Sequence, residues 1–307
     1  MKLDLTHKIK NQARLLGFDL VGIAPAQPLQ KDFEYFKWWL NQGFGADMQY
    51  LYKNLHKREN PTEILQGAQS IICCAMNYYV TKSHGLVSNY AWGDDYHKVL
   101  LKKLKQLSLF IKNDLGIKSN TREYVDTGAI LERSYAAKAG LGWIGKNTCL
   151  INKETGSYVF LGEILTDLEL DYDRPVTDHC GTCTACIEAC PTGALPTAGI
   201  LDANKCISYL TIEYREENLP HDVAHKMGQH IVGCDICQEV CPWNNKAPET
   251  KEAAFHPRKD FAYPDLNKWK GISESEFSEH FQNSPIKRLK WKGLMRNIKN
   301  ALKNAEN

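Results

Sequence analysis

Eight of the eleven cysteines lie in two runs whose spacing can hold iron. Each run contains C-x2-C and ends in C-x3-C-P or its equivalent, so several thiolates are grouped within one short turn. Such a group caps three irons of a cubane [4Fe–4S] cluster, and the fourth thiolate comes from a distant segment. The first run is Cys180, Cys183, Cys186 and Cys190, and the second is Cys206, Cys234, Cys237 and Cys241.

The proline after each run predicts how the ligands are shared. In chains with two such clusters, the cysteine before the proline ligates the other cluster. We therefore define a first thiol group as Cys180, Cys183, Cys186 and Cys241. The second thiol group is Cys190, Cys206, Cys234 and Cys237. Each group has the four ligands that one [4Fe–4S] cluster needs.

Zinc sites and disulfides are the alternatives to clusters. Structural zinc favours four-ligand knuckles with a C-x2-C pair at both ends, which leaves the x3-C-P tails unexplained. Disulfides need an oxidising compartment, to which nothing in the sequence points. The spacing therefore favours two clusters.

Asp126 is the candidate for proton chemistry. It ends a predicted strand at 124–126, and side chains at such strand ends often bind ligands. An apolar edge can raise the pKa of a carboxyl group until it serves as a proton donor. The alternative is an Asx turn or helix cap toward Thr127 and Gly128.

Two further patterns resemble known sites and are set aside. Gly140-x-Gly142-x-x-Gly145 has dinucleotide-binding spacing, but it follows a predicted helix and no strand precedes it. Asp95-x-His97 is similar to the start of a cobalt-histidine signature, but Leu100 stands where that signature has glycine. We expect His97 to be a residue at a helix start that lines a pocket.

Alternating helices and strands over residues 1–170 predict an α/β domain that positions these groups. A helix capped by Thr6 is expected to end at Gly17. The run at 70–78 reads as a central strand in which Cys73 and Cys74 are core residues. Further helices are expected at 33–42, 95–115 and 130–139, and further strands at 19–24 and 158–166.

The remaining residues divide into two parts. Residues 171–247 are expected to form a bacterial-ferredoxin-like α+β domain around the two clusters, and residues 248–307 a short helical tail. Ser273 and Glu276 match a capping box. Basic and apolar residues alternate at 287–299, so this helix either follows a phosphate backbone or packs on the body with a solvated outer face.

Composition sets the cellular context. The chain has 307 residues, 43% of them hydrophobic, and a formal charge of +2, so binding of nucleic acid needs local basic patches. Residues 1–10 have neither an apolar core nor a twin-arginine pair, and no apolar run is long enough to span a membrane. We expect a cytoplasmic protein that does not enter a membrane.

Three segments, together with the cysteine runs, resemble the epoxyqueuosine reductases. They are 125–147, with Val-Asp-Thr-Gly and Gly-Leu-Gly-Trp; 206–211, Cys-Ile-Ser-Tyr-Leu-Thr; and 233–244, Gly-Cys-Asp-Ile-Cys-Gln-Glu-Val-Cys-Pro-Trp-Asn. The resemblance implies an oxidoreductase that removes the epoxide oxygen from epoxyqueuosine at the wobble position of tRNA. It also implies base-off cobalamin held between the two domains, with electrons relayed by two [4Fe–4S] clusters from a ferredoxin, a flavodoxin or a similar low-potential donor.

Residue roles follow from the same resemblance. Asp126 matches the family's proton donor, and Arg133 matches a residue on the tRNA side. Residues that match the cobalamin pocket are Arg58, Ser88, Asp126, Leu150, Leu161 and Ser208. Many members continue into a helical-repeat domain beyond the segment that matches 293–298, so we expect a short, monomeric form whose basic tail takes a larger share of tRNA binding.

Two other classes of protein remain open at this stage. A corrinoid reductase similar to the reductive dehalogenases would share the clusters and cobalamin, although those enzymes usually carry an export signal. A non-enzymatic electron carrier would use the first domain only to dock a partner. Bound cobalamin would exclude the carrier.

Overall fold

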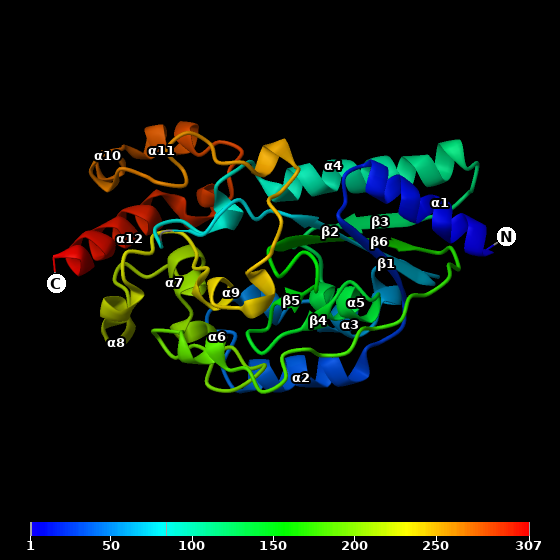
Figure 1. Ribbon diagram of the computed structural model, residues 1–307, viewed down its shortest axis with the longest axis horizontal. Coiled ribbons are helices and arrows are strands. Elements are labelled where there is room, and N and C mark those ends of the chain that lie inside the picture. Colours follow the sequence, from blue (N-terminus) through cyan, green and yellow to red (C-terminus); the bar gives the residue numbers. More distant parts are fainter. Residues whose placement is uncertain (1, 84, 307) are drawn as a thin grey trace.

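The computed structural model describes residues 2–83 and 85–306, and its centre is a four-stranded sheet of order β1-β2-β6-β3 (Figure 1). All three strand pairings are antiparallel. The strands β2 and β6 are buried along nearly their whole length, as their continuous apolar sequences predict. The strands are β1 (Leu20–Pro25), β2 (Ser70–Asn77), β3 (Thr121–Tyr124) and β6 (Val159–Thr166).

Helices cover both faces of this sheet (Figure 1). On one face, α1 (Lys2–Leu15) and α4 (Tyr96–Leu109) pack their apolar sides into a core around Ile72 and Ile164. On the other face, α5 (Glu132–Lys138) packs against Ile71 and Leu165. The layers are those of an α/β domain, but the sheet is antiparallel, unlike the parallel sheet that alternating helices and strands usually form.

The helix and strand positions expected from the sequence are largely present, with errors at the strand before Asp126, where β3 ends at Tyr124, and at the first helix. The helix α1 begins at Lys2, so Thr6 does not cap it. Instead, the buried Thr6 hydroxyl donates to the carbonyl of Lys2, one turn earlier, and accepts from the amide of Asp171. The spacing of the apolar residues predicted the buried face of the helix correctly. A threonine inside a helix can donate its hydroxyl hydrogen to a carbonyl of the preceding turn, so its presence alone does not mark the start of a helix.

The remaining helices of the first domain are short or lie at its edge, and two two-residue strands accompany them. The helix α4 continues into a π-helical turn at Phe110–Asp114, so the helical segment extends nearly to residue 115, where the sequence predicts its end. These elements are α2 (Gln30–Asn41), α3 (Leu55–Glu59), β4 (Trp143–Ile144) and β5 (Leu150–Ile151).

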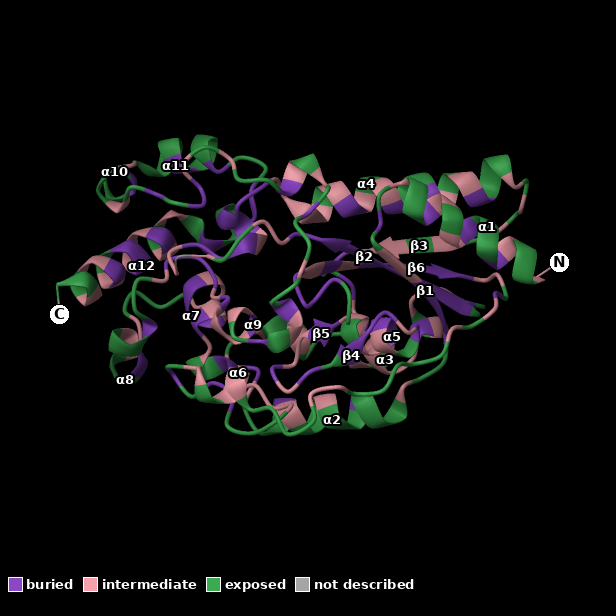
Figure 2. Cartoon of the chain, viewed as in Figure 1, coloured by how far each residue is buried: buried purple, intermediate pink, exposed green. Residues whose placement is uncertain are grey.

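The cysteine runs and the tail form the other half of the molecule (Figure 1). The tail packs into a second core that contains Trp92, Val232, Trp269 and Phe281, and α12 lies buried along one side only (Figure 2). The capping box of Ser273 and Glu276 is present, as predicted. The helices here are α6 (Ala185–Glu188), α7 (Ile207–Ile212), α8 (His221–Ala224), α9 (Ile236–Glu239), α10 (Leu266–Lys270), α11 (Glu274–His280) and α12 (Lys290–Ala305).

Within residues 2–83 and 85–306, none of the helices combines the length and apolar character that crossing a membrane requires.

Candidate functional site

The four thiols of the first group surround one cavity of about 270 Å³. Cys241 lies there with Cys180, Cys183 and Cys186, while Cys190, their neighbour in sequence, does not line the cavity. The two runs meet because α6 and α9, the short helices that contain Cys186 and Cys237, pack against each other. This is the exchange of cysteines that the prolines predict.

The thiols of the second group also lie together. Cys206 and Cys234 both interact electrostatically with Cys190, and Cys237 interacts with Cys234 and Cys206. Burial raises the pKa of the Cys206 and Cys234 thiols, so an ionised thiol there needs a cationic centre such as iron beside it. The structure therefore brings the two groups of four together as the sequence predicts.

The rings of His179 and Trp243 line the first cavity, and Trp143 packs behind them. Trp143 packs edge-to-face against Trp243 and against His179, and its indole nitrogen lies 3.5 Å from Cys180 Sγ. Lys146 Nζ donates to the carbonyls of Gly181 and Cys183, and thereby holds the first cysteine turn against the first domain. A protein sets the reduction potential of a cluster partly through hydrogen bonds to its sulfurs and through the exclusion of solvent from its surroundings.

The geometry also bears on the zinc alternative. The four thiols of the first group line a common volume, which is the arrangement that a cubane cluster needs.

Asp126 lies on the loop that follows β3 and has a positive φ of 58°. Its carboxylate Oδ2 accepts a hydrogen bond from the Tyr96 hydroxyl at 2.7 Å and lies 3.3 Å from His97 Nε2. His97 Nδ1 lies 2.8 Å from Asp95 Oδ1, and Asp95 caps the start of α4. The Asp126 side chain is 61% exposed, so it remains open to a substrate.

The electrostatics correct one expectation. Desolvation pushes the pKa of Asp126 upward, but hydrogen bonds from His97 and Tyr96 outweigh it, and the pKa is lowered. Burial alone would lower the pKa of His97, yet its bonds to Asp126 and Asp95 raise it to about 9. The prediction that an apolar edge raises the pKa of Asp126 is therefore wrong, because two donors face the carboxylate. At neutral pH the proton resides on His97.

The residues expected around a cofactor occupy different environments. Arg58 is half-buried over the Phe36 ring, and its Nε has no hydrogen-bond partner among the described residues. Ser88 is only 3% exposed and donates its hydroxyl hydrogen to the buried Asp235. Leu150 is buried in β5 and Leu161 half-buried in β6. The Arg133 side chain is exposed and donates to the Thr148 carbonyl at 2.5 Å.

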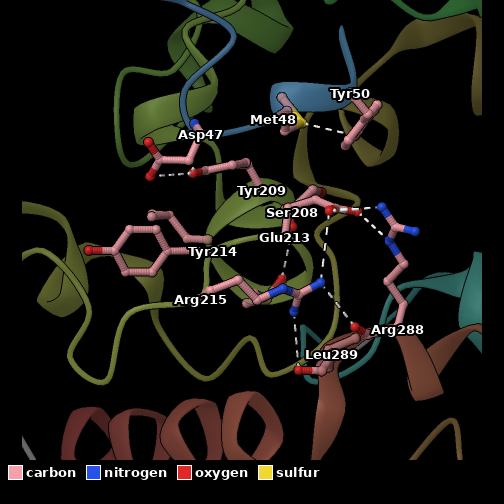
Figure 3. Close-up of polar contacts among 12 residues, drawn as sticks. Asp47, Met48, Tyr50, Ser208, Tyr209, Glu213, Tyr214, Arg215, Arg288 and Leu289 are labelled. Atoms are coloured by element: carbon pink, nitrogen blue, oxygen red, sulfur yellow. Dashed lines mark hydrogen bonds and ion pairs between the residues drawn. The ribbon is translucent and has the colours of Figure 1, made fainter. Parts of the chain in front are cut away.

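Ser208 lies near a charged network that links α7 to the tail (Figure 3). Glu213 receives two hydrogen bonds from Arg288, at 2.7 and 3.0 Å, and Arg215 donates to the carbonyls of Arg288 and Leu289. The guanidinium of Arg288 lies over the Tyr50 ring and contributes to lowering the pKa of Asp126. The tail thus places a positive charge at the edge of the Asp126 site.

Sequence reasoning missed Tyr96 as a site residue and the contact of His97 with Asp126. The sequence did contain a signal for these two residues. Asp95 is a favoured helix-capping residue, so Tyr96 and His97 could have been placed in the first turn of α4. It also passed over Cys149, whose thiol interacts with Cys237 of the second group. Cys149 belongs to neither run and carries no ligand spacing of its own.

The set-aside glycine pattern has a packing role. Gly140 ends the helical segment with a φ of 79°, and a Cβ on Gly142 would lie 2.2 Å from the Ile151 carbonyl oxygen. These glycines let the chain leave α5 and pair β4 closely with β5.

A layered α/β domain that carries an exposed, hydrogen-bonded carboxylate beside two groups of four thiols is typical of an iron–sulfur oxidoreductase. Residues 179–244 match a family model described as a 4Fe-4S double cluster binding domain, and residues 58–127 match one described as epoxyqueuosine reductase QueG. The chain is 42% identical to the epoxyqueuosine reductase of Cellulophaga algicola over 94% of its length and 95% of that protein. The chain belongs to the epoxyqueuosine reductase family, and it is an oxidoreductase of tRNA modification.

Solved structures agree with this assignment. A structure of epoxyqueuosine reductase with an epoxyqueuosine-modified tRNA stem loop has a TM-score of 0.90 and 32% identity, over 97% of this chain and 81% of that chain. A Bacillus subtilis epoxyqueuosine reductase described as having its catalytic aspartate loop swung out of the active site has a TM-score of 0.88 and 31% identity, with the same coverage. A catabolic reductive dehalogenase shares the fold at a TM-score of 0.50 and 16% identity, over 97% of this chain and 38% of that chain.

Proposed function

We propose that this chain reduces epoxyqueuosine to queuosine at the wobble position of tRNA, with cobalamin and two [4Fe–4S] clusters as cofactors. The reaction converts an epoxide to an alkene and releases water, so it consumes two electrons and two protons. The observation that supports the proposal best is the Tyr96–Asp126–His97 arrangement, because it keeps a protonated histidine beside an exposed carboxylate in an iron–sulfur protein of this family.

The clusters are assigned to the two thiol groups. The first group holds one cluster in the cavity beside Trp143 and Trp243, and the second group holds the other. Clusters deliver electrons singly, so a two-electron carrier is needed between them and the substrate. When bound, base-off cobalamin supplies that two-electron chemistry.

The residues that would hold cobalamin fit a large polar ring system with an apolar face. The buried Nε of Arg58 lacks a partner among the described residues, and a corrin carries amide oxygens that such a donor can bind. Leu150 and Leu161 supply apolar surface, and Ser208 a hydroxyl. The Ser88 hydroxyl hydrogen is already donated to Asp235, so Ser88 offers only its oxygen or its Cβ.

The chain's own residues would manage the protons. Asp126 relays a proton from His97, whose raised pKa keeps it charged at neutral pH, to the opening epoxide oxygen. Tyr96 holds the carboxylate in place. By analogy with the B. subtilis structure, the Asp126 loop moves between an inward and an outward position.

Arg133 and the exposed basic residues of the tail would contact tRNA phosphates. The electron donor would be a low-potential ferredoxin, flavodoxin or similar carrier, and the chain would act as a monomer in the cytoplasm.

The test combines protein with reconstituted clusters, cobalamin, a chemical low-potential reductant and tRNA that carries the epoxide. Nucleoside mass spectrometry should then show the loss of one oxygen atom. Clusters and bound corrin without that change of mass would contradict the assignment, and would favour reduction of a small molecule.

A further inference from the structure

Glu163 is a fully buried carboxylate in the middle of the central sheet. It lies on β6 opposite Cys73 of β2 and Tyr124 of β3, and it is 0% exposed. Neither of its side-chain oxygens has a hydrogen-bond partner among the described residues. An ionised carboxylate without a partner is too costly to bury, so this position requires a proton.

The group that meets Glu163 is another carboxylate, Glu132, the first residue of α5. Two carboxylates in contact cannot both ionise without a large cost in free energy. They can form a hydrogen bond with each other only when one of the two carries a proton and donates it. Glu132 Oε1 also accepts the backbone N–H of Asp126 at 2.6 Å. The pair, with Glu163 buried and Glu132 half-buried, therefore connects directly to the loop that carries Asp126.

That loop needs support. Asp126 is in the left-handed region at a φ of 58°, which L side chains rarely adopt, and the amide of Thr127 closes a tight turn onto the Val125 carbonyl at 2.6 Å. A strained conformation persists only where its surroundings hold it. The bond from the Asp126 amide to Glu132 is the contact that ties this turn to α5.

We propose that Glu132 and Glu163 share one proton, and that this pair makes Glu132 the positioning residue for the Asp126 loop. The inference rests on the proposed role of Asp126 as proton donor. With the proton present, Glu132 holds the loop inward. Without it, two facing carboxylates beside the Asp126 carboxylate repel one another, and the loop moves outward.

The electrostatic surroundings agree with one shared proton. Burial raises the pKa of both carboxyls, that of Glu132 to about 8. The cations Arg58 and Arg133 also act on Glu132, but neither contacts Glu163 to replace the proton. The titratable and charged groups around the pair are Arg58, Cys73, Cys74, Tyr96, Tyr124, Asp126 and Arg133.

The test compares the E163Q, E132Q and E132L variants with wild type, and uses E154Q, which changes an exposed carboxylate, as control. Infrared difference spectra at pH 7 should show a protonated-carboxyl band that E163Q lacks. Hydrogen-exchange protection of residues 125–129 in wild type should fall at least tenfold as pH rises through about 8. In E163Q the new side-chain amide at position 163 donates a hydrogen bond to Glu132 at every pH. The fall in protection near pH 8 should therefore vanish in this variant.

E132Q keeps an oxygen acceptor for the Asp126 amide and should retain most of the protection, whereas E132L should lose at least tenfold at pH 7. A missing protonated-carboxyl band, a step that persists in E163Q, or unchanged protection in E132L would each overturn the inference. None of these readouts needs turnover. A chain that shows all three signatures and yet leaves epoxyqueuosine intact would contradict the proposed function alone.

Discussion

The Tyr96 hydroxyl donates a 2.7 Å hydrogen bond to the Asp126 carboxylate, from the first residue of α4 to the loop after β3. A second donor, His97, faces the same oxygen, so Asp126 is an acceptor before substrate arrives. The carboxylate is therefore best understood as the exposed end of a proton relay whose reservoir is His97.

The D126N variant should lose turnover by about 100-fold or more, because general acid catalysis contributes that much and an amide cannot transfer a proton. The amide oxygen still accepts from Tyr96, so the loop geometry should survive. Single-turnover assays with epoxide-bearing tRNA measure the loss, and the corrin absorption spectrum serves as the control for cofactor binding. Full activity in D126N would remove Asp126 from the mechanism.

His97 should impose one alkaline limb on the reaction, above the one set by the Glu132–Glu163 pair. Its pKa in the folded protein is raised to about 9, so its proton is available below that value and lost as pH rises through it. In E163Q, where the step of the carboxylate pair is absent, the pH–rate profile should therefore fall near pH 9. Adding H97Q, which can donate to Asp126 but does not titrate, should slow the reaction and remove this limb. A limb that remains unchanged in H97Q would assign it to another group.

The same linkage affects stability. Because the pKa of His97 is higher in the folded than in the unfolded chain, its stabilising contribution is complete below about 6.5 and disappears as pH rises through about 9. The difference in melting temperature between wild type and H97Q should shrink across that window. A difference in melting temperature that does not change with pH would show that the charge of His97 contributes nothing to the stability of the folded protein.

Sequence reasoning located the thiols better than the residues around Asp126. Cluster ligands follow a spacing rule that holds within a few residues, so the two groups of thiols that lie together in the structure could be predicted, and their ligation of iron stays a prediction. The relay joins residues of α4 to a loop about thirty positions later, and no local pattern records that proximity. The direction of the Asp126 pKa depends on those two donors, so reasoning from the strand end alone gave the wrong sign.

The antiparallel sheet shows a similar limit. Buried apolar runs identify β2 and β6 as central strands, but strands buried on both faces have the same composition in parallel and antiparallel sheets. The order β1-β2-β6-β3 depends on pairing between segments about ninety residues apart. The spacing of apolar residues along the chain indicates which residues are buried. Which strands pair with each other depends on packing between segments that are far apart in the sequence.

Exchanged ligation can be tested with paired serine variants. C241S should disturb the cluster that contains Cys180, and C190S the one that contains Cys206, although each lies in the other run. Each variant should lose up to four of eight irons. Iron analysis and electron paramagnetic resonance of the two clusters check this, with C73A, a buried cysteine outside both groups, as control. Loss of the same cluster in C190S and C180S would refute the exchange.

Cys149 should tune the second cluster. Its thiol interacts with that of Cys237, and donors to cluster sulfurs stabilise the more negative, reduced state. C149A should therefore lower the reduction potential of one cluster and leave the other unchanged, while C149S, which keeps a donor, should shift it less. Redox titration followed by electron paramagnetic resonance measures both. Equal shifts in the two variants would indicate a packing effect.

The tail helix α12 should separate into a structural face and an RNA-binding face. Arg296 donates to the carbonyls of Leu210, Tyr214 and Glu216, so R296A should cost about 2 kcal/mol of stability. Lys287 just before the helix, and Lys292 and Lys299 on its outer side, are exposed. Their triple serine variant should keep wild-type stability and bind tRNA with a slope of log affinity against log salt that is shallower by about 2.

This pair of measurements decides between the two interpretations of the tail. The apolar side of α12 is buried against the rest of the chain, so packing alone explains why the helix exists. Packing does not explain why its outer side is basic, because a solvated face tolerates either sign of charge. If the triple serine variant binds tRNA with the wild-type salt slope, the lysines serve only solvation, and Arg133 with other basic groups must account for the phosphate contacts.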